Sequence, residues 1–186
     1  MQGLDDYIYD RVRRALDDVP PAERADIYVV SLLIYNEEDD PRRPTITVGF
    51  NTETDVSAAV EDAGDEAEAR WNYAFYRQNE LAVVFDAQRD PEGAHVLQNA
   101  INDAGYFFPN EDDVAAQVTT PWFVANTVFA ARRLHDSGDT NRIFGRSIPV
   151  LVHELEYYDP IAMQNLAANP PGVAEDFIRW CRRGAA

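Results

Sequence analysis

The chain has no lysine, so all 16 of its basic side chains are arginines among 186 residues. They face 33 aspartates and glutamates, which leaves a formal net charge of −17. Nucleic-acid phosphates and anionic lipid headgroups repel such a chain, because binding to them depends on positive side chains. We therefore expect neither a nucleic acid nor a membrane as partner. A lysine-free, acidic composition is also typical of a GC-rich genome or a salt-adapted host.

Cysteine occurs only once, at Cys181, so no disulfide can form within the chain. No window approaches the 18 consecutive apolar residues of a membrane-spanning helix, and residues 1–6 lack the features of a secretory signal. These absences predict a cytoplasmic location. The hydrophobic content of 46% excludes general disorder, and the length predicts a single globular domain over residues 1–186.

The negative charge is concentrated in residues 1–113, which carry 26 acids and 9 arginines, whereas residues 114–186 carry seven of each. No acidic run has the alternation of a calcium-binding loop. We interpret two runs either as solvated faces or as a rim for a basic protein, with two tyrosines as aromatic anchors. The candidate partner-binding residues are Glu37, Glu38, Asp39, Asp40, Glu61, Asp62, Asp65, Glu66, Glu68, Tyr73 and Tyr76.

Hydrophobic periodicity predicts an α+β fold, with a small, mostly antiparallel sheet of three to four strands packed with about six helices. Strands are expected at residues 26–35, 45–50 and 147–154, and residues 81–85 form either a further strand or the end of the preceding helix. Helices are expected at residues 4–19, 54–63, 65–78, 90–104, 110–134 with a break at Pro121, 159–168, and from 170 onward. Residues 122–134 are apolar nearly all round, which predicts a helix in the interior.

The residues His153-Glu154-Leu155-Glu156-Tyr157 begin like a zinc-protease helix, but Tyr157 stands where the second histidine ligand is required. His153 with Glu154 and Glu156 could still form an acid–base site at the end of a strand. The alternative is a histidine whose hydrogen bonds are satisfied within the fold.

Other catalytic patterns fail in the same way. Ser147 lacks the glycine that a nucleophile elbow requires, because Pro149 stands at that position, and the nine glycines form no phosphate-binding loop. Cys181 falls on the apolar face of its helix and is expected to be buried and inert. We therefore assign no catalytic residue, no metal ligand and no cofactor.

Three stretches resemble an uncharacterised bacterial family, one of the numbered domains of unknown function. They are residues 27–53, residues 68–73 (EARWNY) and residues 148–159 (IPVLVHELEYYD), and the last continues through Asn169-Pro170. Proteins similar to these are small α+β bacterial proteins that often accompany polymorphic toxins, some of them as immunity proteins. The resemblance implies a binding function and supplies no catalytic residue.

Three hypotheses follow. The first is a non-catalytic acidic binding protein, an immunity-type protein that neutralises a basic toxin domain, because opposite charge steers two proteins together. The second is a hydrolase-type enzyme that uses His153, Glu154 and Glu156. The third is a housekeeping structural domain whose acidity is adapted to its host. The sequence does not determine the oligomeric state. The first hypothesis requires the acids to gather on one face, the second requires His153 to lie in a cleft, and the third requires the acids to be spread evenly over the surface.

Overall fold

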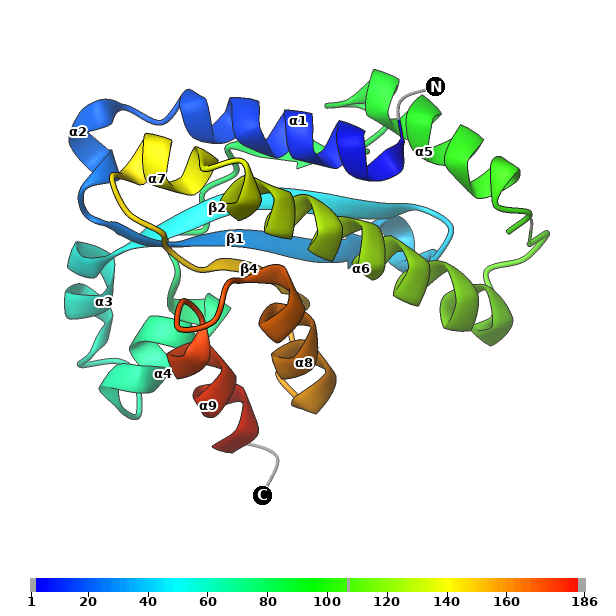
Figure 1. Cartoon of the computed structure of the whole chain (residues 1–186). Helices are drawn as coiled ribbons and strands as arrows, with labels where there is room; N and C mark the ends of the chain where they lie inside the picture. The colour runs from blue at the N-terminus through cyan, green and yellow to red at the C-terminus, as the bar shows by residue number, and fades with distance from the viewer. Residues whose placement is uncertain (1–2, 107, 184–186) are drawn as a thin grey trace.

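A four-stranded sheet runs through the molecule, with helices on both of its faces (Figure 1). The computed structural model describes residues 3–106 and 108–183. The strands are β1 (Ile27–Asn36), β2 (Pro44–Thr52), β3 (Ala82–Val84) and β4 (Val150–His153), in the order β3-β2-β1-β4. The α+β class is confirmed. The sheet is mixed, because β1 pairs antiparallel with β2 but parallel with β4.

The central strand β1 is apolar on both faces, which is why it occupies the middle of the sheet. Val30, Leu32 and Ile34 belong to the larger core cluster, whereas Tyr28 and Val29 belong to the smaller one. Because β1 and β4 run parallel, their carboxyl ends lie at the same end of the sheet. The connections that follow these two strands therefore lie close together at that end.

The described residues form nine α-helices, more than the expected six, because short helices leave little periodicity to read. They are α1 (Leu4–Asp17), α2 (Pro21–Arg24), α3 (Glu53–Ala59), α4 (Glu66–Trp71), α5 (Pro91–Asp103), α6 (Asp113–Asp136), α7 (Asp139–Phe144), α8 (Asp159–Ala168) and α9 (Glu175–Arg183). The helix expected at residues 65–78 ends early, because Asn72 is extended and caps the short 3-10 helix η2 (Tyr73–Phe75). In contrast, α6 continues through Pro121 without a break.

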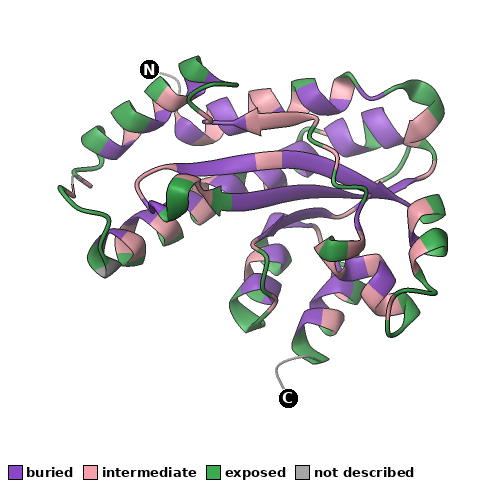
Figure 2. Cartoon of the chain, turned by 180° about the vertical axis from the view of Figure 1, so that it is seen from behind, coloured by how far each residue is buried: buried purple, intermediate pink, exposed green. Residues whose placement is uncertain are grey.

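The helices form two layers. Residues of α1, α5, α6 and α7 pack against one face of the sheet, and residues of α3, α4, α8 and α9 pack against the other. Figure 2 shows β1 and β2 buried along most of their length, while the helices alternate between buried and exposed positions. Both layers share the same sheet, and the single domain over residues 1–186 stays a prediction.

The outer edge of β4 is closed by the side chains of Asn165, on α8, and of Asn169, which caps the C-terminus of α8. Asn165 accepts a hydrogen bond from the Val152 N–H at 2.9 Å and donates one to the Val152 carbonyl at 2.7 Å. Asn169 pairs with Val150 in the same way, at 2.8 and 3.0 Å. Positions i and i+4 of a helix are about 6 Å apart along its axis, close to the spacing of positions i and i+2 of a strand. The two amides therefore replace a fifth strand and fix α8 beside β4 (Figure 1).

We expect Asn169→Leu to lower the free energy of unfolding by about 3 kcal/mol, because it leaves the buried N–H and carbonyl of Val150 without partners. Chemical denaturation monitored by circular dichroism measures this loss. Asn99→Leu on the exposed side of α5 is the control, with an expected change within about 0.5 kcal/mol. Equal stability of the two variants would show that the amide pairing does not hold α8 in place.

Candidate binding groove and acidic edge

A groove of about 530 Å³ lies between α6 and α8. Its α6 wall is a stripe of residues spaced three and four apart, and its α8 wall consists of apolar and small side chains. The stripe is Pro121, Val124, Ala125, Val128 and Phe129, and the facing residues include Tyr158, Pro160, Gln164 and Ala167. Phe129 is 67% exposed, which is unusual for a phenylalanine in the absence of a ligand or partner.

The groove explains why α6 is apolar nearly all round. One side of the helix carries Phe123, Ala130 and Leu134 into the larger core cluster. The opposite stripe carries Ala125 and Phe129 to the surface. The expectation that residues 122–134 lie in the interior is therefore wrong for this stripe. A sequence cannot distinguish a helix buried on two sides from one that is buried on one side and lines a groove on the other.

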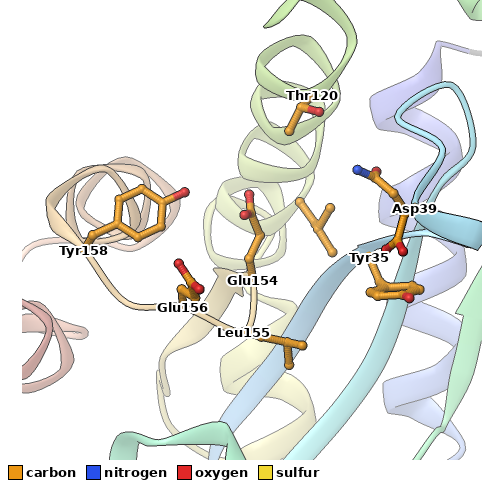
Figure 3. A pocket seen from close by; sticks show the side chains of 9 residues that line it. Tyr35, Asp39, Thr120, Glu154, Leu155, Glu156 and Tyr158 are labelled. Carbon is orange, nitrogen blue, oxygen red and sulfur yellow. The ribbon is translucent and has the colours of Figure 1, made fainter. Parts of the chain in front are cut away.

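A second, smaller hollow of about 250 Å³ continues the groove at the edge where β1 and β4 end (Figure 3). The two hollows share Thr120, Glu154 and Tyr158 as lining residues. In Figure 3, Glu154 stands between Tyr158 on one side and Tyr35 and Asp39 on the other, and its side chain extends toward α6. The carboxyl ends of parallel strands are a common place for ligands in sheets with helices on both faces.

Carboxylates from the connections after β1 and β4 gather around this end of the groove. Three of them line the smaller hollow and form no ion pair with any described residue, and we call them the acidic edge: Asp39, Glu154 and Glu156. Glu111 and Asp112 are separate from it: they precede α6 at the same end of the molecule (Figure 1), where their charges help to raise the pKa of Arg42, and Asp112 caps α6. Burial and the neighbouring Glu156 both raise the pKa of Glu154. A cation at this edge would relieve that repulsion.

The expected rim at residues 37–40 is only partly available. Arg43 pairs with both Glu37 and Glu38, and Arg42 holds the buried Asp40 at 2.6 Å. This pairing lowers the pKa of the Asp40 carboxyl. Asp39 is the one member of the run that remains unpaired among the described residues and faces the hollow. The two arginines follow the turn directly, so folding the hairpin brings them back onto the acids.

The expected rim at residues 61–68 lies elsewhere. These residues follow α3, which begins where β2 ends, at the opposite end of the β1–β2 hairpin from Asp39. A nine-residue strand is about 30 Å long, so the two acidic runs do not form one continuous rim. Asp65 caps α4, and Glu68 accepts a hydrogen bond from the Gly64 N–H. Glu61, Asp62 and Glu66 are exposed and form no ion pair within the described residues.

The two tyrosines proposed as anchors are not surface anchors. Tyr76 is 5% exposed and belongs to the smaller core cluster, so a partner cannot reach it. Tyr73 is partly buried, with its ring 5.2 Å from that of His153 and 5.6 Å from that of Tyr76. The chain leaves the helix at Asn72 and then runs along β2, where the Arg77 N–H donates to the Asn51 side chain and the Leu81 N–H donates to the Val48 carbonyl.

The alternative acid–base site is divided between the core and the surface. His153 is 1% exposed, and Tyr73 and Tyr157 lie against its ring. The Glu154 carbonyl can only accept a hydrogen bond, so the Nδ1–H of His153 donates to it at 2.9 Å, and the unprotonated Nε2 accepts a hydrogen bond from the Ser31 hydroxyl at 2.8 Å. Burial lowers the pKa of His153 to about 4. His153 is therefore a neutral core residue that solvent does not reach, whereas Glu154 and Glu156 line the groove.

A second buried histidine, His135, forms a hydrogen bond between α6 and the C-terminal cap of α8. The Nε2 atom of His135, on α6, lies 3.1 Å from the Asn169 Oδ1, and its Nδ1 lies 3.1 Å from the Ser147 hydroxyl. The amide nitrogen of Asn169 already donates to the Val150 and Asn165 carbonyls, so its oxygen accepts a hydrogen bond from the Nε2–H of His135. Burial lowers the pKa of His135, which keeps the ring neutral. This contact connects α6 to the amide pairing of α8 with β4.

Cys181 is buried on α9, and burial raises the pKa of its thiol to about 12, which makes it unreactive near neutral pH. Within residues 3–106 and 108–183, no three His, Cys, Asp or Glu side chains are grouped so that they could hold a metal ion. In the same part of the chain, no helix has both the length and the apolar character needed to cross a membrane.

Comparisons of the chain with protein-family models, curated proteins and solved structures found no match. The resemblance to a bacterial domain of unknown function thus stays a prediction.

The sequence does not predict the groove, although two of its features are consistent with one. The stripe from Pro121 to Phe129 has helical spacing, and Asn165 and Asn169 are four residues apart, both buried, on α8 and at its C-terminal cap. Neither signal identifies the neighbour across the groove, because α6 and α8 are separated by α7 and β4 in the chain.

We expect the stability of the protein to fall as the pH is lowered from 7 to 5. The unfolded His153 takes up a proton near its ordinary pKa of 6.5, but the folded residue does so only near 4. Between these values the unfolded state binds more protons, so His153 alone accounts for a loss of about 2 kcal/mol.

His153→Gln should reduce this pH dependence by that amount, measured by urea denaturation at the two pH values. His95→Gln on the exposed side of α5 is the matched control and should retain the wild-type dependence. An unchanged dependence in His153→Gln would contradict the assignment of a neutral His153.

Proposed function

We propose that this protein is a non-catalytic binding protein of the cytoplasm whose partner is a basic protein, and that the partner contacts the acidic edge. The observation that carries the proposal is the convergence of Asp39, Glu154 and Glu156 at the end of an exposed apolar groove. The edge lacks ion pairs among the described residues, whereas many acids elsewhere on the chain are paired with arginine.

The combination of charge and apolar surface is the reason for choosing a protein partner. Unpaired carboxylates raise the rate of encounter with a cationic surface and select against anionic ones. Burial of apolar side chains in a groove such as that beside Phe129 supplies most of the affinity in protein complexes. A free cation would use the carboxylates but not the groove, and nucleic acid would be repelled by the edge.

The hydrolase alternative is weakened by the position of His153. A general base must reach the proton that it abstracts, and His153 is enclosed by Tyr73, Tyr157 and the sheet. Glu154 and Glu156 are accessible, but His153, the histidine next to them in the chain, faces the interior and cannot act with them as an acid or base on a substrate. No specific observation on the described residues favours catalysis over binding.

The finer proposal is that the partner is a basic toxin domain and that this chain is its immunity protein. A toxin that acts on nucleic acid needs a positive surface, and an acidic inhibitor would cover that surface. The support is the acidic edge together with the resemblance of residues 148–159 to toxin-associated proteins. Genes for such pairs are adjacent, so the product of the neighbouring gene is the first partner to examine.

To test the edge, we compare two triple variants that change the net charge equally. Asp39→Asn/Glu154→Gln/Glu156→Gln neutralises the edge, and Glu61→Gln/Asp62→Asn/Glu66→Gln neutralises the exposed acids at the opposite end of the hairpin. We expect the edge variant to bind a fluorescent deca-arginine peptide about tenfold more weakly at low salt, as measured by anisotropy. The opposite-end variant should stay within about twofold of wild type. Equal losses would show that only overall charge matters and would contradict the proposal.

The finer proposal is tested by co-expression with the product of the neighbouring gene. Cells that produce the neighbouring gene's product should recover growth when they also produce the wild-type chain or the opposite-end variant. The edge variant should not restore growth. Restoration by all three chains, or by none of them, would rule out immunity through the acidic edge.

A further inference from the structure

We infer that the groove between α6 and α8 binds an amphipathic α-helix of the basic partner, with the arginines or lysines of that helix at the end next to Glu154. This inference rests on the proposed function and specifies how the partner is recognised. It follows from the length of the groove, from the state of the nearest sheet edge and from the distribution of charge along the groove.

The dimensions of the groove suit a short helix. Its α6 wall extends from Pro121 to Arg132. These two residues are 11 positions apart, which corresponds to about 17 Å along the helix axis. A helix of about three turns covers that length. Ala125 and Ala167 contribute small side chains to the lining, one from each wall. Small residues allow a third helix to approach closely, and the exposed ring of Phe129 supplies apolar area for the contact.

An extended segment is disfavoured because the adjacent sheet edge offers no free hydrogen-bonding groups. Recognition by strand addition needs unpaired N–H and carbonyl groups on an edge strand. On β4 those of Val150 and Val152 are already paired with Asn169 and Asn165. An extended peptide in the apolar groove would leave its own backbone unpaired, which is costly, whereas a helix pairs its backbone internally.

The charge along the groove sets the position of the basic residues and disfavours a second copy as occupant. Glu154 lies at one end of the groove and Arg132 lies at the other, paired with Asp136. A helix with cationic side chains at one end is therefore attracted in one orientation. A second copy of this chain would bring a net charge of −17 against the acidic edge, which opposes association.

The test uses two synthetic fluorescent peptides of about 15 residues and identical composition. In the first, leucines at positions i, i+3, i+4, i+7 and i+11 form one face, and arginines are clustered at one end. In the second, the leucines are redistributed around the helix. We expect the first peptide to bind wild-type protein about tenfold more tightly than the second and to gain helical circular dichroism on binding.

Groove variants separate this inference from the proposed function. Ala125→Tyr fills the groove, and Phe129→Ser removes its exposed ring, and each should weaken the amphipathic peptide about tenfold while leaving deca-arginine binding unchanged. Leu166→Ser is the matched control, because Leu166 is 49% exposed on α8 but does not line the groove. It should bind both peptides as wild type does.

Each contrary result has a definite meaning. Equal binding of the two leucine peptides, or insensitivity to Ala125→Tyr, would overturn the helix inference and leave the acidic edge as the binding surface. Full binding of all peptides by the edge triple variant would overturn the proposed function as well. A dimer in sedimentation that Ala125→Tyr converts to a monomer would identify a second copy as the occupant, and this would also overturn the inference.

Discussion

The position of α8 depends on the two asparagine amides that close the outer edge of β4. A short edge strand exposes backbone groups that either remain in water or pair with something, and here Asn165 and Asn169 pair with Val152 and Val150. Each amide supplies one donor and one acceptor, which is what a neighbouring strand would supply at that position. The sheet therefore ends after four strands without an open edge on this side, and a helix stands where a fifth strand would pair.

This arrangement is the reason that a groove exists. The larger core cluster holds α6 against one face of the sheet, and the amides hold α8 beside the sheet edge. The bond between His135 and Asn169 connects the two helices at one end. At the other end the helices are separated by the connection from β4, whose side chains Glu154 and Tyr158 face the opening. Because α6 is held on a face of the sheet and α8 is held at its edge, the apolar stripe of α6 stays exposed to solvent between the two helices.

The charge distribution in space differs from the distribution along the chain. The acids of α1 lie in the negative half of the sequence, but Arg133 pairs with Asp6, and Arg142 pairs with Asp17. Arginines from the neutral half of the chain therefore offset part of the excess. The acidic edge escapes this compensation, because no described arginine forms an ion pair with Asp39, Glu154 or Glu156. Local pairing, more than net charge, determines where the chain can attract a cation.

The sequence predicted the α+β class and the central strand, because both follow from local periodicity and from β1 being apolar on its two faces. It did not predict the parallel pairing of β1 with β4, which is a contact between residues about 120 positions apart. The same limit applies to the site. The pattern of residues 153–156 groups Glu154 and Glu156 with His153, yet β4 ends at the buried His153, and the two acids lie in the connection that follows it and line the hollow.

The apolar stripe of α6 illustrates what a sequence alone cannot decide. Phe123 and Phe129 have the same chemistry and lie on one helix, but the first is fully buried and the second is 67% exposed. The difference arises because Phe123 lies on the side of α6 that packs into the larger core cluster, whereas Phe129 lies on the opposite stripe, which lines the groove. The other wall of that groove is α8, which Asn165 and Asn169, more than 30 positions from Phe129, hold on β4. The binding surface therefore depends on where these two amides place α8 as well as on the periodicity of α6, and only the second can be read from the sequence.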